Sequence, residues 1–161
     1  MVGAWHLGIK ATHEEAQKLA WGLPWLGDDF PGVALPSRTA KFRILELRYK
    51  QKVTFAIVGD LGPWCHDDTD YVDGDARPRS ELFVGDNIDA DLTKEGIQRP
   101  TIPDGKGGMK PAPPSNGAGI DLFPRPARDL GIPIGENVLL DWRFVDASFL
   151  ESLCLRPSVQ S

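Results

Sequence analysis

The stretch that decides the fold is residues 52–64, KVTFAIVGDLGPW. Its first half is rich in β-branched and aromatic residues and is apolar on both faces, which predicts a strand buried in a closed sheet. The run Gly-Asp-Leu-Gly-Pro, residues 59–63, then predicts an abrupt turn, because glycine and proline adopt the backbone angles that turns need. A single carboxylate, Asp60, therefore stands at the end of an apolar strand, with Trp64 just beyond it.

Asp60 has two interpretations. Apolar surroundings disfavour the charged form of a carboxyl group, so Asp60 is expected to hold a proton that it can donate. Alternatively, its carboxylate caps the turn by accepting backbone N–H groups, as aspartate often does in turns. The stretch by itself leaves both interpretations open.

Length and composition limit the possible classes of protein. A chain of 161 residues is expected to form one domain, residues 1–161, around one core. Its net charge of −5 argues against a nucleic-acid partner held by phosphate contacts. No apolar run approaches the roughly 18 residues of a membrane span, and the first residues lack the pattern of a secretory signal. We therefore expect no membrane span and no nucleic-acid partner.

Alternating and periodic patterns predict the other elements. Residues 41–49 alternate between apolar and polar side chains and should form a hairpin with the strand that begins at residue 52. The motif Thr-His-Glu-Glu at residues 12–15 matches a capping box and predicts a helix over residues 13–21. Further strands are predicted at residues 1–11, 81–84, 119–122 and 137–145, and short helices at residues 125–130 and 148–153.

Residues 65–117 form a long excursion rich in acids, proline and glycine. A loop of this length inside a compact domain is usually functional or mobile. The acidic run at residues 66–75 suggests calcium, but it does not follow the ligand spacing of an EF-hand, so a solvated acidic loop is the simpler interpretation. No Cys or His spacing typical of zinc occurs either. We expect neither a metal nor a cofactor.

Three motifs occur in a fixed order, in residues 32–64, 118–132 and 136–145. Together they resemble the double-psi β-barrel of the rare lipoprotein A family, a barrel shared by expansins and by membrane-bound lytic transglycosylase A. The matching residues are Leu35-Pro36, Asp60-Leu61-Gly62-Pro63, Ile120-Asp121-Leu122 and Leu130-Gly131. The resemblance implies a mainly β fold: a six-stranded double-psi β-barrel with short helices and the long inserted loop at 65–117.

The chain departs from the family pattern at two positions. The family commonly has a histidine three positions before the Leu-Pro pair, where this chain has Gly32. The family's usual arginine after the motif aspartate is Leu61 here. The resemblance therefore implies a groove whose second catalytic partner is missing.

The resemblance implies a peptidoglycan-cleaving enzyme of the lytic transglycosylase type. Such an enzyme needs a single carboxyl group, which protonates the glycosidic oxygen and then takes the proton of the sugar's C6 hydroxyl. Asp60 is the expected acid/base. By the family's topology Asp121 comes near Asp60, where it would orient substrate or help Asp60 to keep its proton. Alternatively, Asp121 only favours the N-terminal dipole of the helix that follows it.

Three residues after the central strand are candidates for binding the glycan substrate: Trp64, His66 and Tyr71. Aromatic rings such as those of Trp64 and Tyr71 stack on the apolar face of a pyranose. The alternative for Trp64 is a place in the core.

Two other classes of function remain open at this stage. One is an expansin-like module that binds glycan without cutting it, which the missing histidine at Gly32 favours. The other is a structural protein of a phage or virion that uses the barrel for docking. For the enzyme, we expect a monomer that stays in the cytoplasm until it is released to the cell wall, as a phage-type endolysin does, or one that is carried on the virion.

Overall fold

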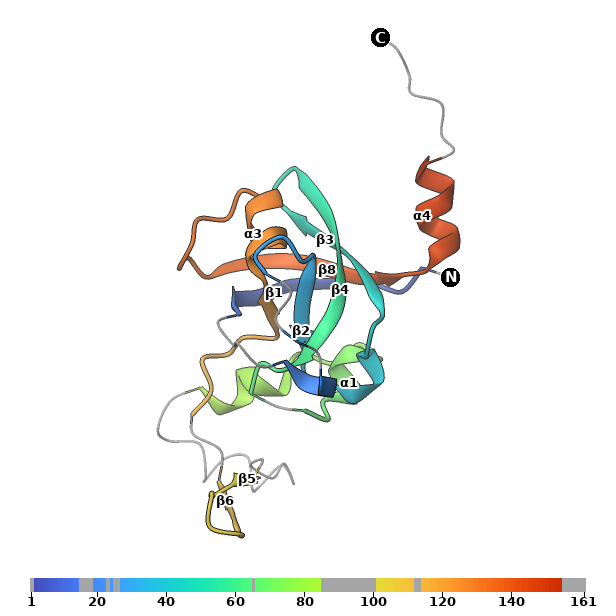
Figure 1. The fold of residues 1–161 in the computed structure, drawn as a ribbon. Coiled ribbons are helices and arrows are strands. Elements are labelled where there is room, and N and C mark those ends of the chain that lie inside the picture. Colours follow the sequence, from blue (N-terminus) through green and yellow to red (C-terminus); the bar gives the residue numbers. More distant parts are fainter. Residues whose placement is uncertain are drawn as a thin grey trace.

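The computed structural model describes residues 2–14, 19–22, 24, 27–64, 66–84, 101–111 and 114–154. The fold is mainly β, with six strands closed into a barrel and short helices around it (Figure 1). The barrel strands are β1 His6–His13, β2 Gly32–Leu35, β3 Ile44–Tyr49, β4 Lys52–Leu61, β7 Ile120–Leu122 and β8 Val138–Val145. The predicted fold class is confirmed.

The order of strands around the barrel is β1-β7-β2-β4-β3-β8. The pairs β1–β7 and β2–β4 are parallel, and the other neighbours are antiparallel. Exchanging β1 with β4, β2 with β7 and β3 with β8 leaves both the order and the directions unchanged. The barrel thus consists of two interlocked halves related by a pseudo-two-fold axis, which is the double-psi arrangement.

The central strand and its hairpin follow the sequence pattern closely. β4 pairs with β3 from Tyr49↔Lys52 at the turn to Ile44↔Ile57 at the far end. β3 starts three residues later than predicted. The 3-10 helix η2 (Arg38–Ala40) is followed by a turn, in which Phe42 has a φ of 59° and the Arg43 N–H donates to the Ala40 carbonyl oxygen. Side chains from all six strands fill the barrel interior, and the largest of the completely buried ones is Trp142.

The predicted start of a helix at residue 13, with Thr12 as its cap, is wrong. Thr12 and His13 belong to β1 and pair in register with Asp121 and Leu122 of β7. Strand pairing satisfies the backbone groups that a helix would otherwise have bonded, so the tertiary partner overrides the local capping pattern. Residues 15–18 lie outside the described residues, and the next element is the 3-10 turn η1 (Ala20–Gly22).

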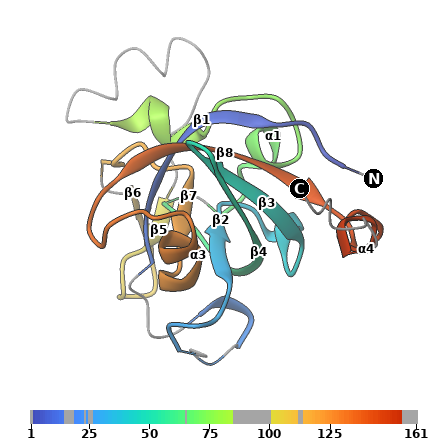
Figure 2. The same ribbon diagram turned by 90° about the horizontal axis from the view of Figure 1, so that it is seen from above.

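The two later helices appear close to the expected positions. α3 spans Pro124–Asp129 and packs against β2, β4 and β7. α4 spans Ala147–Cys154, follows β8 and projects beyond the end of the barrel (Figures 1 and 2). None of the helices in the described part of the chain has the length and apolar character needed to cross a bilayer.

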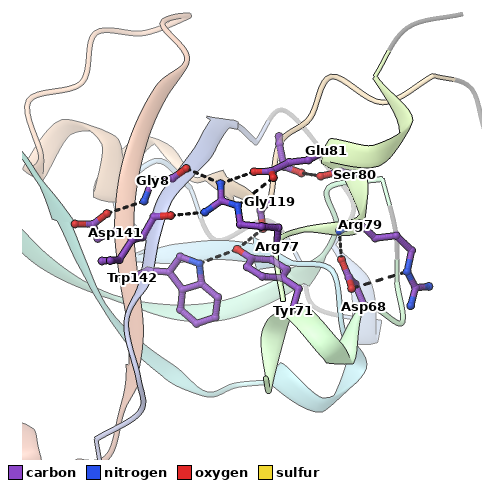
Figure 3. A network of polar contacts seen from close by, with 12 residues as sticks. Gly8, Asp68, Tyr71, Arg77, Arg79, Ser80, Glu81, Gly119, Asp141 and Trp142 are labelled. Atoms are coloured by element: carbon purple, nitrogen blue, oxygen red, sulfur yellow. Dashed lines mark hydrogen bonds and ion pairs between the residues drawn. The ribbon is translucent and has the colours of Figure 1, made fainter. Parts of the chain in front are cut away.

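The first part of the excursion packs onto the barrel through α1 (Thr69–Val72) and η3 (Arg79–Phe83). The predicted strand at 81–84 is therefore wrong. Arg77 joins this part to β1: its guanidinium donates to the carbonyl oxygens of Leu7 (2.5 Å) and Gly8 (2.9 Å) and to the carboxylate of Glu81 (Figure 3). Ser80 adds a buried hydrogen bond to the carbonyl oxygen of Ala118.

The second part of the excursion contains a small hairpin. Its two strands are β5 (Thr101–Pro103) and β6 (Met109–Pro111), which pair with each other and not with the barrel. Figure 1 shows this hairpin well away from the barrel strands. Residues 85–100 lie outside the described residues.

Candidate functional site

Asp60 and Asp121 lie on either side of one residue of β2. Ala34 pairs with Asp60 of the parallel strand β4 and with Asp121 of the antiparallel strand β7. Residues that pair directly across neighbouring strands point to the same face of the sheet. Val33 and Leu35 belong to the core, so the two carboxylates share the face opposite to the barrel core.

A β-bulge in β4 puts Asp60 on that face. Val33 pairs with Val58, and the next residue, Ala34, pairs with Asp60, so that Gly59 is an extra residue in the ladder. A bulge changes the face to which the following side chain points. Without the bulge, Asp60 would share the face of Val58, which lies in the core.

Asp60 is nearly buried, with 7% of its surface exposed. One of its carboxylate oxygens accepts a hydrogen bond of 2.6 Å from the backbone N–H of Ala20 in η1. One interpretation of the sequence was that Asp60 caps its own turn by accepting backbone N–H groups, whereas this N–H group belongs to a residue 40 positions earlier in the chain. The segment covers Asp60, which does not lie in the open groove that the resemblance implied.

Asp121 is the more accessible of the two carboxyl groups and accepts a hydrogen bond from the Thr12 hydroxyl. Its pKa is raised to about 6, chiefly by burial and also by the negative charge of Asp60, while the Thr12 bond and the nearby His13 oppose the increase. Asp121 is therefore the carboxyl group that holds a proton in mildly acidic solution. Asp121 is thus a second candidate for the acid/base role that the sequence analysis gave to Asp60.

The turn after β4 passes close to Asp121. Gly62 has a φ of 141°, and a Cβ at this position would lie 3.8 Å from a carboxylate oxygen of Asp121. The peptide bond between Gly62 and Pro63 is cis. The motif of residues 60–63 and the motif of residues 120–122 thus meet in space, as the resemblance implied.

Phe123 occupies the space beside Gly32. A Cβ at position 32 would overlap the phenyl ring of Phe123, which is completely buried at the start of α3. The similar family commonly has histidine at this position, and here no side chain fits there. The carboxyl pair therefore has no histidine partner from position 32.

The three candidate substrate-binding residues have different environments. Tyr71, from α1, is completely buried; its hydroxyl accepts from the Trp142 indole N–H (2.7 Å) and donates to the Gly119 carbonyl (3.2 Å) (Figure 3). Its ring is therefore part of the core and offers no face to a sugar, contrary to our expectation. Trp64 is half-buried with its ring against Phe83, the centroids 5.0 Å apart, and His66 is exposed.

A cavity of about 520 Å³ adjoins the strands that carry Thr12 and Asp121. Its walls come from the end of β1, from α3 and from the loop at residues 131–135, and include His13, Leu122, Ala127, Arg128 and Ile132. The imidazole of His13 is held by a 2.7 Å hydrogen bond between its Nε2 and the Glu136 carbonyl oxygen. Neither carboxyl group lines this cavity: along β1 and β7 the side chains of His13 and Leu122 alternate in direction with those of Thr12 and Asp121.

Sequence reasoning missed Thr12 and Ala20. Thr12 lies 109 residues from Asp121, and Ala20 lies 40 residues from Asp60. No local pattern joins residues so far apart. The Thr12 hydroxyl was instead attributed to a helix cap, which the pairing of β1 with β7 excludes.

No protein-family model matches the chain, and no curated protein matches it. Within the part of the chain that the structure describes, no group of three or more His, Cys, Asp or Glu side chains could hold a metal ion. The function must therefore be argued from the carboxyl pair itself.

Proposed function

We propose that this chain cleaves the glycan strands of peptidoglycan by the lytic transglycosylase route, with Asp121 as the acid/base. The raised pKa of Asp121 beside Asp60 supports this proposal more than any other observation. A general acid works best when its pKa lies near the pH of the reaction, and a pKa of about 6 meets this requirement. The partial exposure of Asp121 gives a substrate access that the nearly buried Asp60 lacks.

Asp121 would act twice in one turnover. In its acid form it gives its proton to the glycosidic oxygen while the bond from that oxygen to C1 breaks. The resulting carboxylate then takes the proton of the C6 hydroxyl, and the C6 oxygen closes onto C1 to give a 1,6-anhydro sugar. The proton is back on Asp121 at the end, and no water is consumed.

Asp60 would act through its charge. A fixed negative charge stabilises the positive charge that develops at C1 in the transition state. The same charge raises the pKa of Asp121. The variant Asp60→Asn should therefore lower the pKa of Asp121, which carboxyl NMR titration measures. An unchanged pKa of Asp121 would show that the charge of Asp60 does not act on it.

Digestion of purified peptidoglycan, followed by mass spectrometry of the released sugars, tests the reaction. The wild-type chain should release 1,6-anhydro muropeptides, and Asp121→Asn should do so on the order of 10²-fold more slowly or worse. Asp75→Asn, in an exposed turn, is the matched control and should cut like the wild type. Failure of the wild type to release any anhydro sugar would exclude this function.

A second candidate, favoured by the Phe123 ring beside Gly32, is a module that binds glycan without cutting it. The missing side chain at position 32 removes a partner that the lytic members of the similar family use. This candidate predicts that the chain sediments with purified cell walls while the released sugars show no anhydro products.

A further inference from the structure

Trp21 and Phe42 form an aromatic ledge at the surface. Their ring centroids lie 5.7 Å apart with an interplanar angle of 66°. Phe42 has 49% of its surface exposed, and Trp21 is half-buried with part of its ring against the core. We call these two residues the aromatic ledge.

The aromatic ledge lies beside Asp60. Trp21 directly follows Ala20, whose N–H donates to the Asp60 carboxylate. Phe42 donates its backbone N–H to the carbonyl oxygen of Val58, two residues before Asp60 on β4 (3.0 Å). The ledge is thus fixed from two sides to the strand that carries one member of the carboxyl pair.

Both ledge residues have a left-handed backbone, with φ of 58° at Trp21 and 59° at Phe42. This conformation is unfavourable for bulky side chains, which is why glycine or asparagine usually occupies it. Backbone strain of this kind is often found at binding sites. Two large aromatic residues held at such positions point to a use for the rings themselves.

Lys41 places a positive charge over the ledge. Its ammonium nitrogen lies 5.0 Å from the ring centroid of Phe42 and 5.7 Å from that of Trp21, and the residue is exposed. An ammonium group above two aromatic faces can donate hydrogen bonds to an anionic group of a ligand that stacks there. The ledge therefore combines an apolar corner, formed by two rings inclined at 66°, with a cation.

We propose that Trp21, Phe42 and Lys41 form a subsite for a pyranose ring that bears a carboxylate. The apolar face of the sugar would stack on the ledge, and its carboxylate would accept hydrogen bonds from Lys41. Glycan strands without stem peptides contain such a unit in their lactyl-bearing sugar, whereas in intact peptidoglycan the lactyl carboxyl group is amide-bonded to the peptide. This inference rests on the proposed function, since it names how the same glycan is held beside Asp60 and Asp121.

Asparagine variants test the ledge with little disturbance of the fold, because asparagine tolerates a left-handed backbone better than other non-glycine residues. In the Asp121→Asn background, Trp21→Asn and Phe42→Asn should each weaken the binding of peptide-free glycan strands on the order of tenfold by calorimetry. Lys50→Asn, at another left-handed position with φ of 53°, should leave binding unchanged. Should Trp21→Asn fail to fold, the exposed Phe42→Asn still decides the question.

A charge variant tests the carboxylate. Lys41→Gln should weaken binding of the lactyl-bearing glycan and leave the weaker binding of a neutral chitooligosaccharide unchanged. Equal losses for both sugars would overturn the assignment of Lys41, and unchanged binding in both asparagine variants would overturn the ledge.

The result separates the subsite from the reaction. If the wild type releases no anhydro sugar but loses glycan binding in the ledge variants, the subsite stands and the lytic mechanism fails. If it cuts glycan while the ledge variants bind and cut normally, the reaction stands and the subsite fails. If the wild type neither binds nor cuts glycan, both fail.

Discussion

At the scale of single residues, the role proposed for Asp121 links the stability of the fold to the proposed activity. A carboxyl group with a raised pKa is destabilised in its charged form by the folded state, so Asp121 weakens the fold once it ionises above its pKa of about 6. The variant Asp121→Asn should therefore raise the free energy of unfolding at pH 7.5 by on the order of 1 kcal/mol. Urea unfolding measures this, and it should accompany the loss of glycan cleavage. A less stable Asp121→Asn protein would indicate a purely structural aspartate.

Thr12 tunes the same group. Its hydroxyl lowers the pKa of Asp121 by bonding to the carboxylate, so Thr12→Val should raise that pKa further. In the proposed mechanism the reaction begins with the protonated acid, so the high-pH limb of the activity profile, where cleavage declines, should move to higher pH. Thr12→Ser, which restores the hydroxyl, should return the limb to its wild-type position. An unmoved limb in Thr12→Val would contradict the role of Asp121.

At the scale of elements, β2 packs closely against the start of α3, where Gly32 lies beside the ring of Phe123. Because a Cβ at Gly32 would overlap the ring of Phe123, Gly32→Ala should destabilise the fold by about 1–3 kcal/mol, the usual cost of overpacking a core. The same substitution should cost clearly less in a Phe123→Ala background, where the ring is gone. Chemical denaturation of the four proteins of this double-mutant cycle measures the coupling, and additive losses would contradict the contact.

Local patterns predicted the elements whose signals are local. The alternation of residues 41–49 and the turn before residue 52 were enough for the β3–β4 hairpin, and a proline and a glycine marked the limits of α3. The predicted helix start at residue 13 failed because the partner of Thr12 lies 109 residues away in β7. A capping box is a local preference, and a parallel strand partner outweighs it.

The candidate site was predicted in part for the same reason. The resemblance brought the motifs of Asp60 and Asp121 together, because it carries the topology of the barrel. The raised pKa of Asp121 depends on burial and on neighbours such as Thr12 and Asp60, which only the folded chain brings close. The burial of Tyr71 likewise follows from the packing of α1 onto Trp142.

At the scale of the whole molecule, two groups oppose each other in their effect on acid stability. Burial lowers the pKa of His6 to about 4, against 6.5 for a free histidine, where its ring stacks on Trp142 with centroids 4.0 Å apart. Between these values the unfolded chain binds a proton that the folded chain does not, so stability is lost as the pH falls from 6.5 to 4. Asp121 acts in the opposite sense, since between about pH 4 and 6 the folded chain holds a proton that the unfolded chain has released.

Single variants should therefore distinguish the contribution of His6 to the pH dependence of the free energy of unfolding from that of Asp121. His6→Phe keeps an aromatic ring on Trp142 but does not titrate, so its free energy of unfolding should decline more steeply than that of the wild type as the pH rises from 4 to 6. Asp121→Asn should show the reverse, a steeper rise over the same range. Buried Asp68, whose pKa is also raised, acts in the direction of Asp121 in all three proteins. Parallel curves for the wild type and His6→Phe would show that His6 does not titrate differently on folding.

The closure of the barrel has a consequence for the newly made chain. β8 (Val138–Val145) pairs with both β1 and β3 and so closes the ring of strands. Until β8 has left the ribosome, β1 and β3 each lack a neighbour and present unpaired edges to other chains. Residues 138–145 must therefore be synthesised before the sheet can be sealed, and the edges of β1 and β3 stay open to aggregation until then.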